Sequence, residues 1–180
     1  SPLAVEPGAA VSGRWLVICD SPDYGRRLAN VFSAHGADAV LAVARRAATC
    51  QRLDESCYEI DPSDRGQLRT LLETLASHSS IVRGVVYCAV NAQNASGGMS
   101  TEALLAAQSR MCAPVLALVQ TLTEMSGVVG PSVCLVTRGV HAVAGEAPTI
   151  DGVAASPIWG FARSAAREYP EVRFTRIDVD

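Results

Sequence analysis

Short apolar runs bounded by turn-forming residues alternate along this chain with segments long enough for helices. The runs cover residues 14–19, 38–43, 57–60, 81–90, 132–137 and 172–179. Helical periodicity and capping residues mark segments 22–35, 61–77, 101–125 and 154–168, whereas residues 44–56 are expected to form a loop. This alternation indicates parallel βαβ units. It predicts an α/β fold of three layers, with a doubly wound, mainly parallel sheet in the strand order 3-2-1-4-5-6.

The length of the chain suits one domain. With 180 residues, of which 49% are hydrophobic, it can bury about 70% of the surface that the unfolded chain exposes. Residues 1–12 are small, aperiodic and contain proline, and we interpret them as a linker that precedes a single domain at 13–180.

The chain contains no lysine, because all fifteen of its basic residues are arginine. Short-chain reductases built on sheets of this kind need a Tyr-x-x-x-Lys pair to relay a proton. The positions four residues after the tyrosines hold Leu28, Pro62, Asn91 and Arg173. The sequence therefore predicts that this chain has no catalytic residues of that type.

The turn after the first strand is where a Rossmann fold carries the glycines that bind a pyrophosphate. Here only Gly25 remains. Pro22 removes a backbone N–H from the helix start, and Ser21 and Asp23 suit capping of that helix. Asp20 and Asp23 would also repel a phosphate. The degenerate turn predicts that the chain binds no cofactor.

Metal and disulfide sites are not indicated by the cysteines and histidines. The six cysteines lack metal-ligand spacing, and three of them stand inside apolar runs, where a cysteine acts as a small hydrophobe. The six cysteines are Cys19, Cys50, Cys57, Cys88, Cys112 and Cys134. The three histidines are scattered, and we expect them at the surface. Buried free thiols favour a reducing, cytoplasmic location.

Two of the expected helices, 101–125 and 153–166, carry apolar or small side chains nearly all round. A helix of this kind is buried on every side. The sheet can cover one face, and the other face predicts an interface with a second domain or a second copy of the chain.

The chain resembles the N-terminal structural subdomain of ketoreductases in modular type I polyketide synthases. The most specific stretch is 157–180, PIWGFARSAAREYPEVRFTRIDVD. Supporting matches are the residues at 15–17 and 83–87, and those at 135–140 leading to Val143. The resemblance covers about residues 13–180.

The resemblance implies a truncated Rossmann fold, like that of short-chain dehydrogenases/reductases, that has lost cofactor and active site and braces a catalytic half. Trp159 stands where an active reductase keeps Tyr-x-x-x-Lys, and Thr137 near the place of its serine. The bracing surface would use the two apolar helices, for which the sequence offers Leu104, Leu105, Met111, Leu118, Ile158, Trp159, Phe161 and Arg163. Which of these face the partner and which face the sheet is open at this stage.

By the same resemblance, NADPH belongs to the catalytic half, which reduces a β-ketoacyl chain on an acyl carrier protein. The expected partners are that half in cis and the neighbouring dehydratase, enoylreductase and acyl carrier protein domains. A net charge of −3 and the lack of an apolar run near ~18 residues predict neither nucleic acid nor membrane as partner. Two alternatives stay open: a nucleotide-binding regulatory domain that uses Arg45 and Arg46, and a homodimer formed through the apolar helices.

Overall fold

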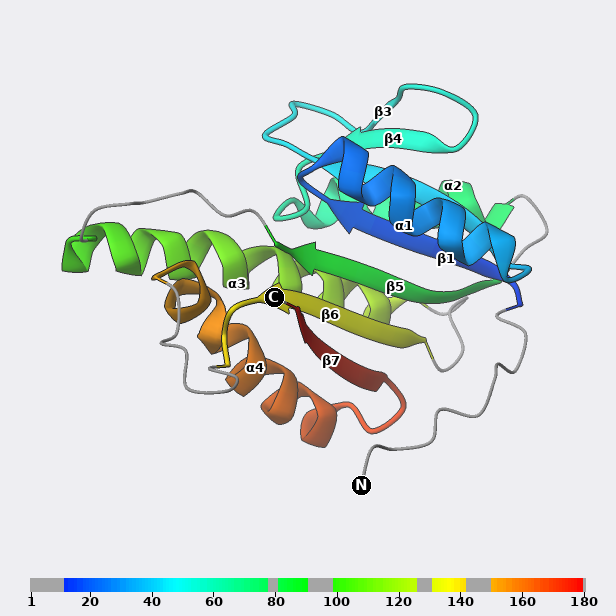
Figure 1. The fold of residues 1–180 in the computed structure, drawn as a ribbon. Helices are drawn as coiled ribbons and strands as arrows, with labels where there is room; N and C mark the ends of the chain where they lie inside the picture. Colours follow the sequence, from blue (N-terminus) through cyan, green and yellow to red (C-terminus); the bar gives the residue numbers. More distant parts are fainter. Residues whose placement is uncertain (1–11, 78–80, 91–98, 126–130, 142–149, 180) are drawn as a thin grey trace.

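The computed structural model describes residues 12–77, 81–90, 99–125, 131–141 and 150–179 (Figure 1). The linker expected at 1–12 lies outside the described residues except for its last position. The match at Val143 lies outside them as well.

The described strands form one seven-stranded sheet, in the order β3-β4-β2-β1-β5-β6-β7. Its strands are β1 (Arg14–Cys19), β2 (Asp38–Ala44), β3 (Gln51–Arg52), β4 (Cys57–Ile60), β5 (Val82–Ala89), β6 (Ser132–Arg138) and β7 (Arg173–Val179). Without β3, the six parallel strands have the order predicted from the sequence. The antiparallel β3 falls inside the expected loop 44–56, and that prediction was wrong there. Its two residues are polar and exposed, so no apolar pattern marks them.

Four helices join the strands: α1 (Pro22–Ala34), α2 (Arg65–Ser77), α3 (Thr101–Glu124) and α4 (Ile150–Glu168). Two of these helices, α2 and α4, begin at residues other than those predicted from the sequence. Helix α2 begins after residue 61 because the Asp61 carboxylate accepts hydrogen bonds from the backbone and hydroxyl of Ser63, which form a separate turn. Asp64 then accepts from the first N–H groups of the helix. Helix α4 begins four residues earlier than residue 154.

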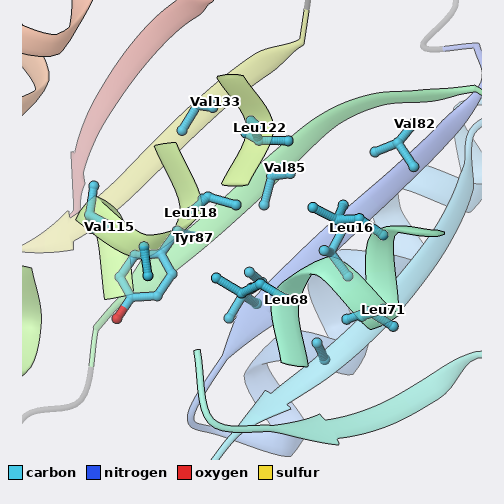
Figure 2. Close-up of a cluster of buried hydrophobic side chains, with 14 of the residues drawn as sticks. Leu16, Leu68, Leu71, Val82, Val85, Tyr87, Val115, Leu118, Leu122 and Val133 are labelled. Carbon is cyan, nitrogen blue, oxygen red and sulfur yellow. The ribbon is translucent and has the colours of Figure 1, made fainter. Parts of the chain in front are cut away.

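The helices are divided unequally between the two faces of the sheet (Figure 1). Helix α1 alone packs on one face, over β1 and β2, whereas α2, α3 and α4 cover the other. The larger core lies under these three helices, where Leu68 and Leu71 of α2 meet Leu16 and Leu118 (Figure 2). On the α1 side, Ile177 of the edge strand β7 stays 44% exposed.

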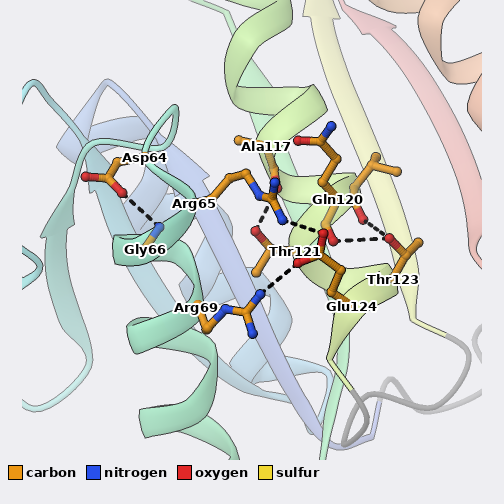
Figure 3. Close-up of polar contacts among 10 residues, drawn as sticks. Asp64, Arg65, Gly66, Arg69, Ala117, Gln120, Thr121, Thr123 and Glu124 are labelled. Atoms are coloured by element: carbon orange, nitrogen blue, oxygen red, sulfur yellow. Dashed lines mark hydrogen bonds and ion pairs between the residues drawn. The ribbon is translucent and has the colours of Figure 1, made fainter.

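Helices α2 and α3 are joined at their exposed edges by two ion pairs (Figure 3). Arg65 and Arg69 of α2 both contact the carboxylate of Glu124 at the end of α3, the second at 2.8 Å. These side chains are exposed, so the pairs contribute at most about 1 kcal/mol each. Burial of the leucines beneath them holds the two helices in place.

The two halves of α3 lie in different environments. After Pro114 the helix runs over the sheet, and Val115, Leu118 and Leu122 are buried. Before Pro114 only Ala107 is buried, and this half extends past the strand ends (Figure 1). By length and composition alone α3 could cross a membrane. Because its second half packs against β5, α2 and α4, we interpret it as a core helix.

Gly84 of β5 lies where β1, β5 and β6 pack closely together, and a side chain at this position would meet backbone atoms of β6. An added Cβ would lie 2.7 Å from the Ser132 carbonyl oxygen and 2.5 Å from the Trp15 ring, which packs on Phe32 of α1. We expect Gly84→Ala to lower the free energy of unfolding by about 1–3 kcal/mol in urea titrations. An unchanged value would contradict the described contact between β1, β5 and β6.

Candidate functional site

The turn between β1 and α1 is closed by its own residues. Ser21 caps α1, with its hydroxyl accepting from the N–H of Tyr24 at 3.4 Å, and the Ser21 carbonyl receives the N–H of Gly25 at 2.9 Å. Pro22 occupies the first turn and offers no N–H. Asp23 adds a negative charge at the helix start. At this helix start one backbone donor is missing, at Pro22, and those of Tyr24 and Gly25 are already used by Ser21.

Gly25 serves packing in this turn. It is buried, and a Cβ would lie 2.5 Å from a Leu41 methyl group and 3.2 Å from the Cys19 Cβ. The glycine lets α1 approach β1 and β2 closely. Sequence reasoning named Gly25 as the surviving glycine of the turn, and the structure gives it the role of the glycine for helix–strand packing.

A hydrogen-bonded network joins the ends of β6 and β7 to α4. The Trp159 indole N–H donates to the Thr137 hydroxyl at 2.9 Å, and that hydroxyl donates to the Asp178 carboxylate at 2.7 Å. The other oxygen of Asp178 accepts from the backbone N–H of His141 at 2.8 Å. Thr137 is fully buried. An indole N–H donates and cannot accept, so Trp159 cannot take up a proton from Thr137.

Trp159 is held by its ring as well as by its N–H. The His141 ring packs edge-on against it at 4.4 Å, and the Arg176 guanidinium lies 5.5 Å from its centre. The side chain is therefore half-buried within this chain. We conclude that Trp159 fastens α4 to the ends of β6 and β7.

A cavity of about 210 Å³ lies between the carboxyl ends of β1 and β5 and the helices α3 and α4. It is lined by Asp20, Tyr87, Ala89, Met99, Ala107, Arg110, Met111, Asp151 and Ala154. Burial raises the pKa of Tyr87 well above its ordinary value, so its hydroxyl stays protonated. The cavity is smaller than typical ligand pockets of about 300 Å³ or more, and two carboxylates line it.

The structure divides the eight residues predicted for the docking surface. Leu118 and Ile158 have no exposed surface, because they point from their helices onto the sheet, and we remove them from that surface. Met111 and Phe161 are partly buried and pack against the same core.

The other four predicted residues reach solvent. Leu105 is 58% exposed and Arg163 is exposed, whereas Leu104 and Trp159 are half-buried. Sequence periodicity could not separate these groups, since α3 and α4 are apolar or small nearly all round.

Exposed residues at helical spacing form two neighbouring stripes on the outer sides of α3 and α4. We define the docking face as Leu105, Ala113 and Leu116 of α3 with Val153 and Gly160 of α4. The two helices contact each other, and their opposite sides are covered by the sheet. The docking face therefore points away from the core of this chain.

Gly160 is the least explained residue of the docking face. A Cβ there would meet nothing within 4 Å, so nothing among the described residues requires glycine. Glycine inside a helix costs about 1 kcal/mol relative to alanine. This open position contrasts with Gly152 of the same helix, where a Cβ would overlap the Gly139 carbonyl.

Comparison with known proteins identifies the family. The family model described as "Polyketide synthase extender module SpnB, Rossmann fold domain" matches residues 35–180. The chain belongs to this family of polyketide synthase Rossmann domains. It is 32% identical over 170 residues to polyketide synthase GfsA of Streptomyces halstedii, and 34% identical over 164 residues to pikromycin polyketide synthase component PikAII of Streptomyces venezuelae. These matches cover 94% and 91% of the chain but only 2% and 4% of the relatives' lengths.

Solved structures support the fold of this polyketide synthase domain. An N-terminal ketoreductase from the macrolactin assembly line matches with a TM-score of 0.71 at 8% identity, over 92% of this chain and 32% of that one. A short-chain dehydrogenase/reductase from Serratia marcescens matches with a TM-score of 0.60 at 16% identity, over 94% and 79%. The Rossmann-like fold of the short-chain dehydrogenase/reductase type is confirmed.

Sequence reasoning missed two members of this network: Asp178, which accepts from Thr137, and His141, whose ring packs on Trp159. A signal was available for Asp178, because polar residues at the carboxyl ends of neighbouring parallel strands lie together, and Thr137 pairs with Asp178 in the sheet register. No comparable pattern points to His141.

The hydrogen bonds to Asp178 predict how the stability of the domain depends on pH. Burial alone would raise the pKa of Asp178, but hydrogen bonds from the N–H of His141, the Thr137 hydroxyl and the N–H of Val140 hold it below its usual range. A lowered pKa in the folded state stabilises the fold above the unfolded value of about 3.9, and this contribution is lost as the pH falls through the folded pKa. We expect Asp178→Asn to cost about 1–3 kcal/mol at neutral pH, with a difference from wild type that shrinks below about pH 4. Urea titrations across this range test it, and a pH-independent difference would contradict the role of the charge.

Proposed function

We propose that this domain is a non-catalytic scaffold that binds and stabilises the catalytic ketoreductase half of a polyketide synthase, in cis. The parent multienzyme would use that half, with NADPH, to reduce a β-ketoacyl chain on its acyl carrier protein. The observation that carries the proposal is the exposed docking face. Because the chain spans 2–4% of its curated relatives, ample further sequence exists in such proteins to supply the partner.

The docking face suits a partner helix pair. Its apolar members Leu105, Leu116 and Val153 are 58%, 44% and 42% exposed, on helices whose other sides are already buried. Apolar surface gathered on one face of a soluble domain commonly marks an interface. The half of α3 before Pro114, which carries Leu105, lies beyond the strand ends (Figure 1).

The former catalytic positions support a binding role over a chemical one. No lysine is present, Trp159 and Thr137 bind each other, and the turn at Ser21–Gly25 uses its own donors. The cavity beside Asp20 holds two carboxylates, Asp20 and Asp151, against one guanidinium, Arg110, so its charged lining as a whole does not favour an anionic cofactor. We therefore infer that NADPH is bound by the catalytic half alone.

The nucleotide-binding alternative has little support around Arg45 and Arg46. Arg45 lies 3.6 Å from the Glu59 carboxylate, and Arg46 is an exposed side chain. A carboxylate beside Arg45 competes with any phosphate that would bind there.

Exposed leucines of the docking face should matter for association and little for folding. We expect the double variant Leu105→Ser, Leu116→Ser to keep the stability of the isolated domain within about 0.5 kcal/mol of wild type. Its affinity for the separately produced catalytic half should fall about tenfold or more, measured by calorimetry.

The matched control is Val31→Ser, which removes a side chain of similar exposure (53%) from α1 on the opposite side of the sheet. It should leave the affinity unchanged. Equal affinities of all three proteins would overturn the docking face, and concentration-dependent dimerisation of the domain without its partner would favour the homodimer.

Replacing Gly160 with alanine should raise the stability of the domain but weaken its binding to the catalytic half. Gly160→Ala should raise the unfolding free energy of the isolated domain by about 0.5–1 kcal/mol, since alanine favours helix and its Cβ meets open space. It should also weaken association with the catalytic half, because close helix approach tolerates no added methyl group. Stronger or unchanged binding would argue that the partner does not pack at this point.

A further inference from the structure

A second surface, basic and outside the docking face, lies on the flank of α4 toward the edge strand β7. It is a cavity of about 270 Å³. We define the arginine cavity by its lining residues, which are Ala162, Arg163, Ala166, Arg167, Phe174 and Arg176. None of these arginines lines the cavity beside Asp20.

The three guanidinium groups of the arginine cavity have no carboxylate partners among the described residues. The ion pairs found among the described residues involve other arginines, which lie on β1, α1, α2 and the segment after β2. The Arg176 guanidinium lies 5.5 Å from the centre of the Trp159 ring, a contact that leaves its positive charge unneutralised. The acidic residues nearest in sequence, Glu168, Glu171 and Asp178, do not line the cavity. The Asp178 carboxylate accepts hydrogen bonds from Thr137 and His141 instead.

Three like charges around one cavity repel each other, so an anion placed between them is stabilised. The chain as a whole carries a net charge of −3, which makes this basic cluster a local feature. Arg163 and Arg167 are one helical turn apart and present their forks on the same side of α4. Guanidinium forks of this kind match carboxylates and phosphates.

The surroundings favour carboxylates carried by a protein over a free phosphate. Phosphate sites commonly use backbone N–H groups at the start of a helix, whereas the arginine cavity lies along the last turns of α4, where carbonyl groups end the helix. All of its donors are long side chains. Between them Phe174 and two alanines offer apolar surface, which suits the mixed side chains of a protein segment.

We propose that the arginine cavity receives an acidic segment of the catalytic ketoreductase half, so that docking has an apolar part and a charged part. This inference rests on the proposed function. Continuity supports it, because Arg163 and Arg167 follow Gly160 of the docking face by three and seven residues on one helix stripe. The charged part would set the register of the two halves and speed their encounter.

The test uses this domain and the catalytic half of the same multienzyme, produced separately. Their dissociation constant is measured by calorimetry at about 50 mM and about 500 mM sodium chloride. We expect wild-type affinity to fall about tenfold or more with salt, and Arg163→Gln, Arg167→Gln to weaken binding by a similar factor at low salt and to flatten the salt dependence. Arg27→Gln, an exposed arginine of α1, is the control and should behave as wild type.

Each outcome separates the two proposals. No association of the wild-type proteins at either salt concentration would contradict the proposed function itself. If neither salt nor the double variant changes the association, the docking face remains supported. The proposal that an acidic segment binds in the arginine cavity is then wrong. Thermal stabilisation of the domain alone by inorganic pyrophosphate, absent in the double variant, would overturn it in favour of a small anion.

Discussion

The structure depends on one constraint: α3 and α4 carry apolar or small side chains on two opposite sides, and the sheet can cover only one. The covered side forms the larger core with α2 and the inner face of the sheet. The other side is left as the docking face. Because the hydrophobic effect is proportional to apolar area removed from water, this exposed area favours burial against another protein surface. The same helices therefore complete the fold and, under the proposed function, offer the surface that binds the catalytic half.

The positions where, by the family resemblance, an active reductase keeps its catalytic residues hold a structural network in this chain. Where proton relay would require a titrating pair, Trp159 and Thr137 form a neutral hydrogen bond that Asp178 extends to β7. The turn after β1 keeps its glycine for close packing and caps its helix with Ser21. Both places contribute to the fold through these contacts, so under the proposed scaffold role the Rossmann sheet would keep its structure without a bound cofactor.

Much of the fold could be predicted from the sequence, and the limits have physical causes. Apolar runs with helical segments between them predicted the order of the six parallel strands, since parallel connections leave few alternatives. The strand β3 was missed because Gln51 and Arg52 are polar and exposed. Helix periodicity failed to separate Leu118, which is buried, from Leu116, which is exposed, because a helix that is apolar all round has no preferred face. The arginine cavity needs α4 and β7 side by side, which only the three-dimensional arrangement provides.

The most direct test of the account is calorimetry with NADPH on the isolated domain, on the catalytic half and on their complex. The scaffold role predicts no heat of binding for the isolated domain at high micromolar cofactor, and one NADPH per complex. One-to-one binding to the isolated domain, or two cofactors per complex, would mean that the turn at Ser21–Gly25 still accepts a phosphate, and would contradict the scaffold role.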